Sequence, residues 1–163
     1  MHDEPVRLKV WTYVCGHCGA LYRLPGADLS FNYGTFLAVS RHGEVTILDS
    51  FQDQILDEVL RLMSDDDRSK ALSDEERRQL LMAVLSYVLD RDGHGDRFHL
   101  DGSSGCPLCG SRTIGSFASS EEDAGITDRA ASHRRWDAMT AEERRQAVGE
   151  ALDSEVDGAP GPH

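Results

Sequence analysis

The sequence has no long hydrophobic run, because charged residues interrupt its apolar segments throughout. Hydrophobic residues make up 39% of the 163-residue chain, and aromatic residues only 7%. No stretch approaches the roughly 20 consecutive apolar residues that a membrane-spanning helix needs, so we expect no membrane partner. The N-terminus also lacks the basic and then apolar pattern of a secretory signal, and we therefore expect a cytoplasmic protein.

Positive charge is scarce. The chain has 17 Lys and Arg residues against 29 Asp and Glu residues, which gives a formal net charge of -12. Lys9 and Lys70 are the only lysines, an arginine bias that a GC-rich bacterial genome also produces. An acidic protein repels phosphate backbones, so binding to nucleic acid is disfavoured.

Cysteine is equally rare, but its four copies form a pattern. They fall as two C-x2-C pairs, which are Cys15 with Cys18 and Cys106 with Cys109. Each pair is followed by glycine, which permits the positive φ that closes a tight turn around a metal ion. Two such turns complete a tetrahedral site of four thiolates, so the spacing predicts one closed, structural metal site.

The segments around the cysteines resemble the paired knuckles of rubredoxin and rubredoxin-like zinc ribbons. The resemblance covers Tyr13-Val14-Cys15-x-x-Cys18-Gly19-x-x-Tyr22 and Cys106-Pro107-Leu108-Cys109-Gly110. Rubredoxin itself would imply iron and one-electron transfer, whereas a zinc ribbon implies zinc without a redox role. We favour zinc, because 87 residues separate the two pairs and Ser103-Ser104-Gly105 precedes Cys106 where rubredoxins have an aromatic residue. His17 is expected to be a surface residue beside the ligands.

The pattern of the remaining chain predicts an α+β fold, a discontinuous zinc ribbon that brackets a β-hairpin and two helices. Alternating β-formers predict ribbon strands, and apolar residues at helical spacing predict helices. The strands are expected over 7–14, 20–24, 36–40, 45–48, 97–101 and 112–117. The helices are expected over 51–63, capped by Asp49 or Ser50, and from the Ser73 capping box to residue 89. The expected domains are ribbon halves at 7–26 and 103–117, an insertion at 27–102, and a tail at 118–163.

The tail differs in composition from the rest of the chain. An acidic linker is expected over Ser119–Gly125, weak helical potential over Ile126–Trp136, and disorder over 157–163. A capping box from Thr140 to Glu143 opens a final helix with few apolar residues. Such a helix either packs on its own domain or binds another protein, with Trp136 as the candidate contact.

Few other residues indicate chemistry. The sequence has no phosphate-binding glycine loop, no nucleophile elbow and no spare cysteine, so we predict no catalytic residues. If the chain is an enzyme, His94 and His99 with Asp92, Asp96 and Asp101 are the one cluster to consider. Residues 90–101 also have the acid spacing of a calcium loop, although a polar turn explains them better.

These patterns favour a protein-protein interaction or accessory module with a structural Zn²⁺ site. The alternatives are a rubredoxin-like iron electron-transfer protein and a nucleic-acid-binding zinc ribbon.

Overall fold

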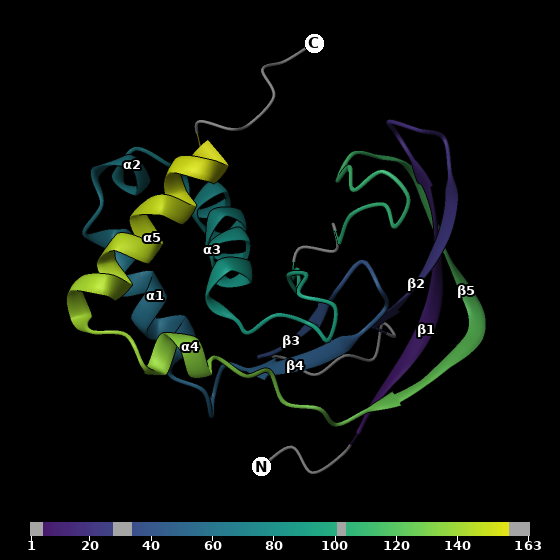
Figure 1. Ribbon diagram of the computed structural model, residues 1–163, viewed down its shortest axis with the longest axis horizontal. Coiled ribbons are helices and arrows are strands. Elements are labelled where there is room, and N and C mark those ends of the chain that lie inside the picture. The colour runs from purple at the N-terminus through teal and green to yellow at the C-terminus, as the bar shows by residue number, and fades with distance from the viewer. Residues whose placement is uncertain (1–4, 28–33, 101–103, 157–163) are drawn as a thin grey trace.

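A computed structural model describes residues 5–27, 34–100 and 104–156. The predictions for Asp101, Ser103 and the tail at 157–163 lie outside the described residues. Figure 1 shows helices α1, α3 and α5 gathered on one side of the molecule and a three-stranded sheet on the other, with the β3–β4 hairpin between them. The predicted α+β class is confirmed.

We use the name ribbon for the three-stranded sheet and the two cysteine turns at its end. Its central strand β1 (Val6–Cys15) pairs antiparallel with β2 (Leu21–Ala27) on one side and with β5 (Ile114–Thr127) on the other. The aromatic rings of Tyr13 and Tyr22, which face each other across β1 and β2, stack with centroids 5.2 Å apart. The ribbon strands predicted from residues 7–14 and 20–24 are therefore confirmed.

Strand β5 corrects the prediction of an acidic linker over Ser119–Gly125. These residues continue the strand that leaves the second cysteine pair, and they pair with β1 as far as Val6 and Thr127. Lys9 forms an ion pair with Glu121, and the Ser120 hydroxyl donates to the Val10 carbonyl. An edge strand can carry many charges because one side of it faces solvent, and such charges also prevent pairing with other chains. Composition alone could not distinguish this strand from a linker.

The second sheet is the predicted hairpin of β3 (Thr35–Val39) and β4 (Val45–Asp49). Gly43 closes its turn with a φ of 82°, a conformation that glycine adopts without steric penalty. The strand predicted over 97–101 is reduced, within the described residues, to one bridge between Val39 and His99.

Helix α1 (Ile55–Ser64) begins later than the predicted start at residue 51. The Asp49 carboxylate accepts a hydrogen bond from the Phe51 N–H at 2.9 Å, which closes a turn instead of capping the helix. A second aspartate, Asp53, accepts from the Ile55 N–H at the true start. Phe51 consequently lies outside the helix and is exposed. A short helix α2 (Asp67–Lys70) follows.

Both capping boxes form as predicted. At the start of α3 (Asp74–Val88), the Ser73 hydroxyl accepts from the Glu76 N–H and the Glu76 carboxylate accepts from the Ser73 N–H. Thr140 and Glu143 exchange the same pair of bonds before α5 (Ala141–Val156). These reciprocal bonds satisfy backbone donors that a helix start otherwise leaves without partners.

The final helix packs on its own domain. Within 126–136 only α4 (Arg134–Asp137) is helical, and it places Trp136 in the core with 1% of its surface exposed. The indole N–H donates to Glu58 at 3.0 Å, and Arg144 of α5 binds the other oxygen of that carboxylate. The helical core contains residues of α1, α3 and α5, namely Val59, Met63, Val84, Leu85, Val148, Ala151 and Leu152. The buried Trp136 is therefore unavailable as a surface contact for a partner.

Candidate metal centre

The two cysteine pairs sit in turns with the same hydrogen bonds. In the first turn Gly19 donates to the Cys15 carbonyl at 3.0 Å, and in the second Gly110 donates to the Cys106 carbonyl at 2.8 Å. Gly19 and Gly110 have φ values of 73° and 75°. A Cβ on either glycine would strain this left-handed conformation, so the glycine after each pair is part of the turn itself.

Strands β1 and β5 bring the two turns together. The Gly16 N–H donates to the Thr113 carbonyl at 2.8 Å, which joins the first turn to the chain that leaves the second. A Cβ at Gly16 would lie 2.7 Å from Thr113 Cγ2 and 3.3 Å from the Gly115 nitrogen. Gly16 therefore permits a close backbone approach that a larger residue would disturb.

The four sulfur atoms form a cluster of tetrahedral dimensions. Their Sγ atoms all lie within 4.8 Å of one another. Cys15 and Cys109 are 3.6 Å apart, and Cys18 and Cys106 are 3.8 Å apart. A zinc ion with Zn–S bonds of about 2.3 Å needs sulfur atoms about 3.8 Å apart. The donor set and its spacing therefore fit one metal ion in a closed site.

Backbone groups stabilise negative charge on the first pair. The N–H groups of His17 and Cys18 point at Cys15 Sγ from 3.4 and 3.5 Å. The bond from Cys18 has the largest effect in lowering the pKa of Cys15 to about 6. A backbone hydrogen bond from Ser111 lowers the pKa of Cys109, but partial desolvation and contacts with the other three thiols together outweigh it and raise this pKa to about 12. A bound cation would favour four thiolates together.

The sequence prediction of the ligand set fits this geometry. Cys15 and Cys106 are buried within the ribbon core, while Cys18 and Cys109 lie at its surface. His17 is exposed, and it contributes its backbone N–H to the cluster. Four thiolates on one ion leave no coordination position for a substrate, so the cluster is compatible with a structural site for either zinc or iron.

A second cluster of possible ligands contains two residues of the predicted histidine site and one residue that was not predicted. His94 and Asp92 lie together, and the third member is His42 from the turn between β3 and β4. His99 bonds to the backbone of Val39 elsewhere on the hairpin. Sequence reasoning missed His42 because it is 50 residues from Asp92, and only the fold brings the two together.

The acids at 90–96 do not form the calcium loop. Asp90 accepts from the N–H groups of Arg134 and Arg135 and so caps α4. Asp92 accepts from the N–H groups of His94 and Asp96, which closes a local turn. Because these carboxylates point at different partners, the polar-turn interpretation is confirmed.

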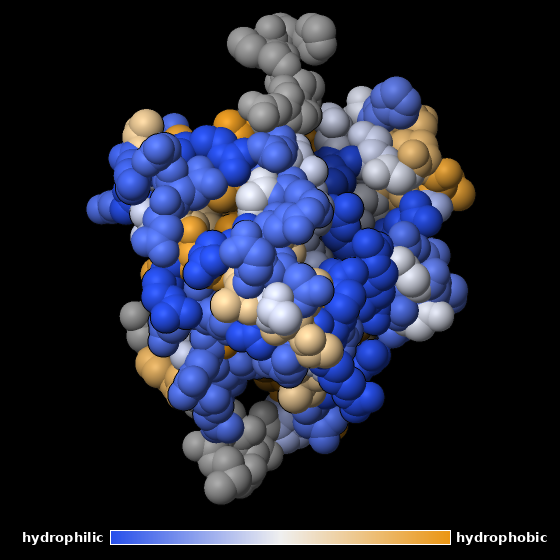
Figure 2. All heavy atoms as spheres, turned by 60° about the vertical axis from the view of Figure 1, so that its left-hand side comes forward, coloured by the Kyte–Doolittle hydropathy of each residue, from blue (hydrophilic) through white to orange (hydrophobic). Residues whose placement is uncertain are grey.

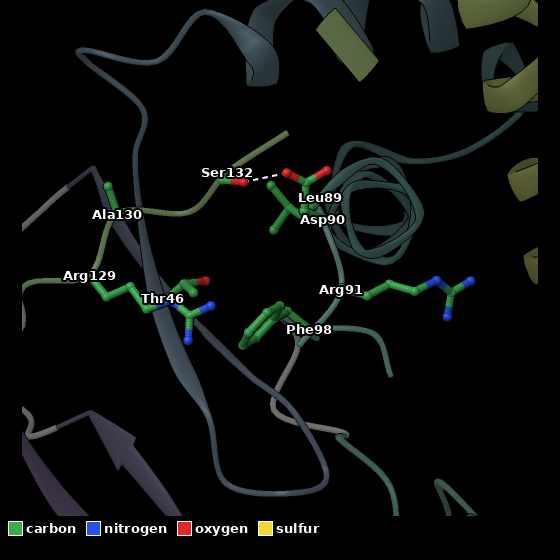
Figure 3. A pocket seen from close by; sticks show the side chains of 8 residues that line it. All are labelled: Thr46, Leu89, Asp90, Arg91, Phe98, Arg129, Ala130 and Ser132. Atoms are coloured by element: carbon green, nitrogen blue, oxygen red, sulfur yellow. Dashed lines mark hydrogen bonds between the residues drawn. The ribbon is translucent and has the colours of Figure 1, made fainter. Parts of the chain in front are cut away.

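A small cavity lies beside this turn, between α3 and β4. Figure 3 shows the Phe98 ring along its lower side, with Ser132 pointing toward Asp90 above it. Its volume is about 40 Å³. Small-molecule sites usually have about 300–1,000 Å³, so this cavity does not accommodate a metabolite.

Comparison of the chain with protein-family models, curated proteins and solved structures finds no significant match. No helix among the described residues is long and apolar enough to cross a membrane.

Proposed function

We propose that the chain is a protein-protein interaction or accessory module built on a structural zinc ribbon. The observation that carries the proposal is the closed cluster of four cysteine sulfurs, which fixes two distant chain segments side by side. A site of this kind supplies rigidity, and the surface that it rigidifies supplies the function. The proposed location is the cytoplasm.

Zinc is the proposed metal. The thiolate set accepts both zinc and iron, so the ligands alone do not choose between them. The long separation of the two cysteine pairs in the sequence departs from rubredoxin, and that departure supports zinc.

The exposed apolar residues support a protein partner. Among the described residues, four of the six large exposed hydrophobic side chains belong to the ribbon: Leu21, Leu108, Phe117 and Ile126. Leu108 lies between two metal ligands and is 79% exposed. Figure 2 shows that the face turned toward the helical side of the molecule is mostly hydrophilic, with small hydrophobic areas. Apolar side chains held by a metal-rigidified turn are suited to contact with another protein, because little conformational entropy remains to be lost on binding.

The charge of the ribbon argues against nucleic acid. Glu121 of β5 pairs with Lys9 of β1, and Glu122 pairs with Arg23 of β2, so these basic groups are partly neutralised within the ribbon. Asp123 adds further negative charge to the same strand. The strands carry Arg7, Lys9 and Arg23 against these three acids, so the sheet offers no net positive charge to a phosphate backbone.

The metal is tested on protein purified without a tag and without added metal. We expect one zinc per chain by mass spectrometry and no visible absorption. One iron per chain, with visible thiolate-to-iron absorption, would replace this proposal by the electron-transfer alternative. A salt-sensitive mobility shift with single-stranded nucleic acid would instead support a nucleic-acid-binding zinc ribbon.

The partner surface is tested with two matched variants in the source cells. Leu108→Ser removes the apolar group from the second turn, and Phe51→Ser removes an exposed apolar group far from it in sequence. We expect a protein that is crosslinked to the unmodified chain to be lost from Leu108→Ser and retained by Phe51→Ser, with the zinc content unchanged in both. Equal crosslinking of both variants contradicts a partner surface at the metal turn.

The division into domains is also a proposal. We propose ribbon halves at 7–26 and 103–117, an insertion at 27–102 and a terminal segment at 118–163. This division predicts that the insertion can be shortened outside the β3–β4 hairpin without loss of the metal, because Val39 and Val45 of the hairpin pack in the ribbon core. The strand assignment of 119–125 attaches the start of the terminal segment to the ribbon.

A further inference from the structure

His42, Asp92 and His94 form a compact group that has no part in the cysteine site. Each offers one ligand atom, and the three atoms lie within 4.8 Å of one another. His42 comes from the turn between β3 and β4, whereas Asp92 and His94 come from the turn after α3. The two imidazole rings stack with their centroids 4.1 Å apart.

Asp92 has an oxygen atom whose hydrogen bonding is incomplete. Its side chain is fully buried, and the Ser40 hydroxyl approaches the carboxylate, but no described residue makes a hydrogen bond of good geometry to Oδ2. The other oxygen, Oδ1, accepts from the His94 and Asp96 N–H groups at 2.9 and 2.7 Å. A buried carboxylate oxygen with so weak a donor is unfavourable, so its presence beside two imidazoles points to a cation.

The surrounding residues hold the histidines in place. His42 Nε2 contacts the Asp96 carboxylate at 2.5 Å, and Arg41 Nε donates to the same oxygen at 2.9 Å. When the neutral His42 ring donates from Nε2, its Nδ1 keeps a free lone pair. Metal-ligating histidines usually donate their other N–H to a carboxylate in this way.

Glu44 supports the other side of the group. Its carboxylate accepts from the Gly93 N–H at 3.0 Å and lies 3.5 Å from His94 Nδ1. Arg129 binds the second oxygen of Glu44 and balances its charge. The group therefore has two carboxylates beyond Asp92 within reach of its histidines, each already paired with an arginine.

We propose that His42, Asp92 and His94 bind a divalent transition-metal ion in a second, open site. Imidazole nitrogen and carboxylate oxygen suit Zn²⁺, Co²⁺ and Fe²⁺, and three protein ligands leave at least one position for a small molecule. His94 Nδ1 and Asp92 Oδ2 are 4.0 Å apart, which is more than two ligands of one small ion require. His94 is 61% exposed, so rotation of its side chain can close this gap.

The experiment uses full-length protein in which the cysteine site is filled with zinc, and Co²⁺ as the probe. Titration followed by calorimetry and visible absorption is expected to show one additional Co²⁺ per chain. Its spectrum should lack the intense thiolate-to-cobalt absorption that exchange into the cysteine site would produce. Failure to saturate at millimolar Co²⁺ overturns the proposal.

Asp92→Asn is the most informative variant, because the amide oxygen can still accept from the His94 and Asp96 N–H groups while the negative charge is lost. We expect Co²⁺ affinity to fall at least about tenfold, with the fold retained by circular dichroism. His94→Ala should have a similar effect, since its side chain is largely exposed. His133→Ala is the matched control, as it removes a histidine that pairs with Asp53 and Asp137 outside the group. Unchanged affinity in Asp92→Asn and His94→Ala, or an equal loss in His133→Ala, overturns the assignment.

Discussion

Asp66 and Arg68 connect helix α2 to α5 through single side chains. The Asp66 carboxylate caps α2 by accepting from the Arg68 N–H, and it also binds the Arg68 guanidinium through both oxygens. Arg68 reaches onward to Asp153 and to the Gly149 carbonyl of α5. The hydrogen bonds that Asp66 accepts, first those from the Arg68 side chain and then that from the Arg68 N–H, lower the pKa of Asp66 to about 2.

A pH dependence follows from this pair. Because the folded-state pKa of Asp66 lies below its ordinary value of 3.8, its contribution to stability is fully present above that value and is lost as the pH falls toward 2. Arg68→Ala is expected to raise the pKa of Asp66 and to lower the free energy of unfolding at pH 7 by about 1 kcal/mol, since the pair is partly solvated. NMR titration of the Asp66 carboxyl and urea unfolding measure the two effects. An unaltered Asp66 titration in Arg68→Ala contradicts the assignment.

Local residue patterns explain which parts of the fold were predictable. Capping boxes and C-x2-C turns are short-range devices, so Ser73, Thr140 and the four cysteines could be identified without the fold. The continuation of β5 past residue 117 could not, because its acidic residues are stabilised by partners on β1 and β2 that are far away in sequence. His42 escaped prediction for the same reason, as did the burial of Trp136 against Glu58.

Helix α5 contains a glycine that its fold does not require. Gly149 lies inside the helix, and a Cβ there would meet only Arg68 Nη2 at 3.9 Å, an ordinary contact distance. Alanine loses less backbone entropy than glycine on entering a helix. Gly149→Ala is therefore expected to raise the free energy of unfolding by about 0.5–1 kcal/mol, measured by urea denaturation of the metal-loaded protein.

The control for Gly149→Ala is the same substitution at a glycine with a positive φ. Gly110 has a φ of 75°, so Gly110→Ala is expected to destabilise the protein and to weaken its metal binding. A loss of stability in Gly149→Ala would show that Arg68 cannot tolerate the added methyl group.

At the scale of the whole molecule, we expect the ribbon core and the helical core to differ in their dependence on a bound metal ion. The ribbon core contains Cys15 and Cys106 together with Val39 and Val45 of the hairpin. The helical core contains no cysteine among its described residues, and Trp136 and Leu152 lie within it. Removal of the metal should therefore weaken the ribbon and its contact with the hairpin first.

Hydrogen exchange measures this difference. After chelation we expect amide exchange to accelerate in β1, β2 and the first half of β5, while α3 and α5 keep most of their protection. Restoring zinc should restore the slow exchange. Uniform acceleration through α3 and α5 would mean that the two cores unfold as one unit.

The separation of the two cysteine pairs also sets an order of events during synthesis. The first pair leaves the ribosome 87 residues before the second, which corresponds to a delay on the order of 10 s at usual rates of translation. During that interval β1 and β2 can pair, but the thiols of Cys15 and Cys18 lack the second cysteine pair and remain accessible to oxidants. A nascent chain of this protein thus depends on a reducing environment until residue 109 has emerged.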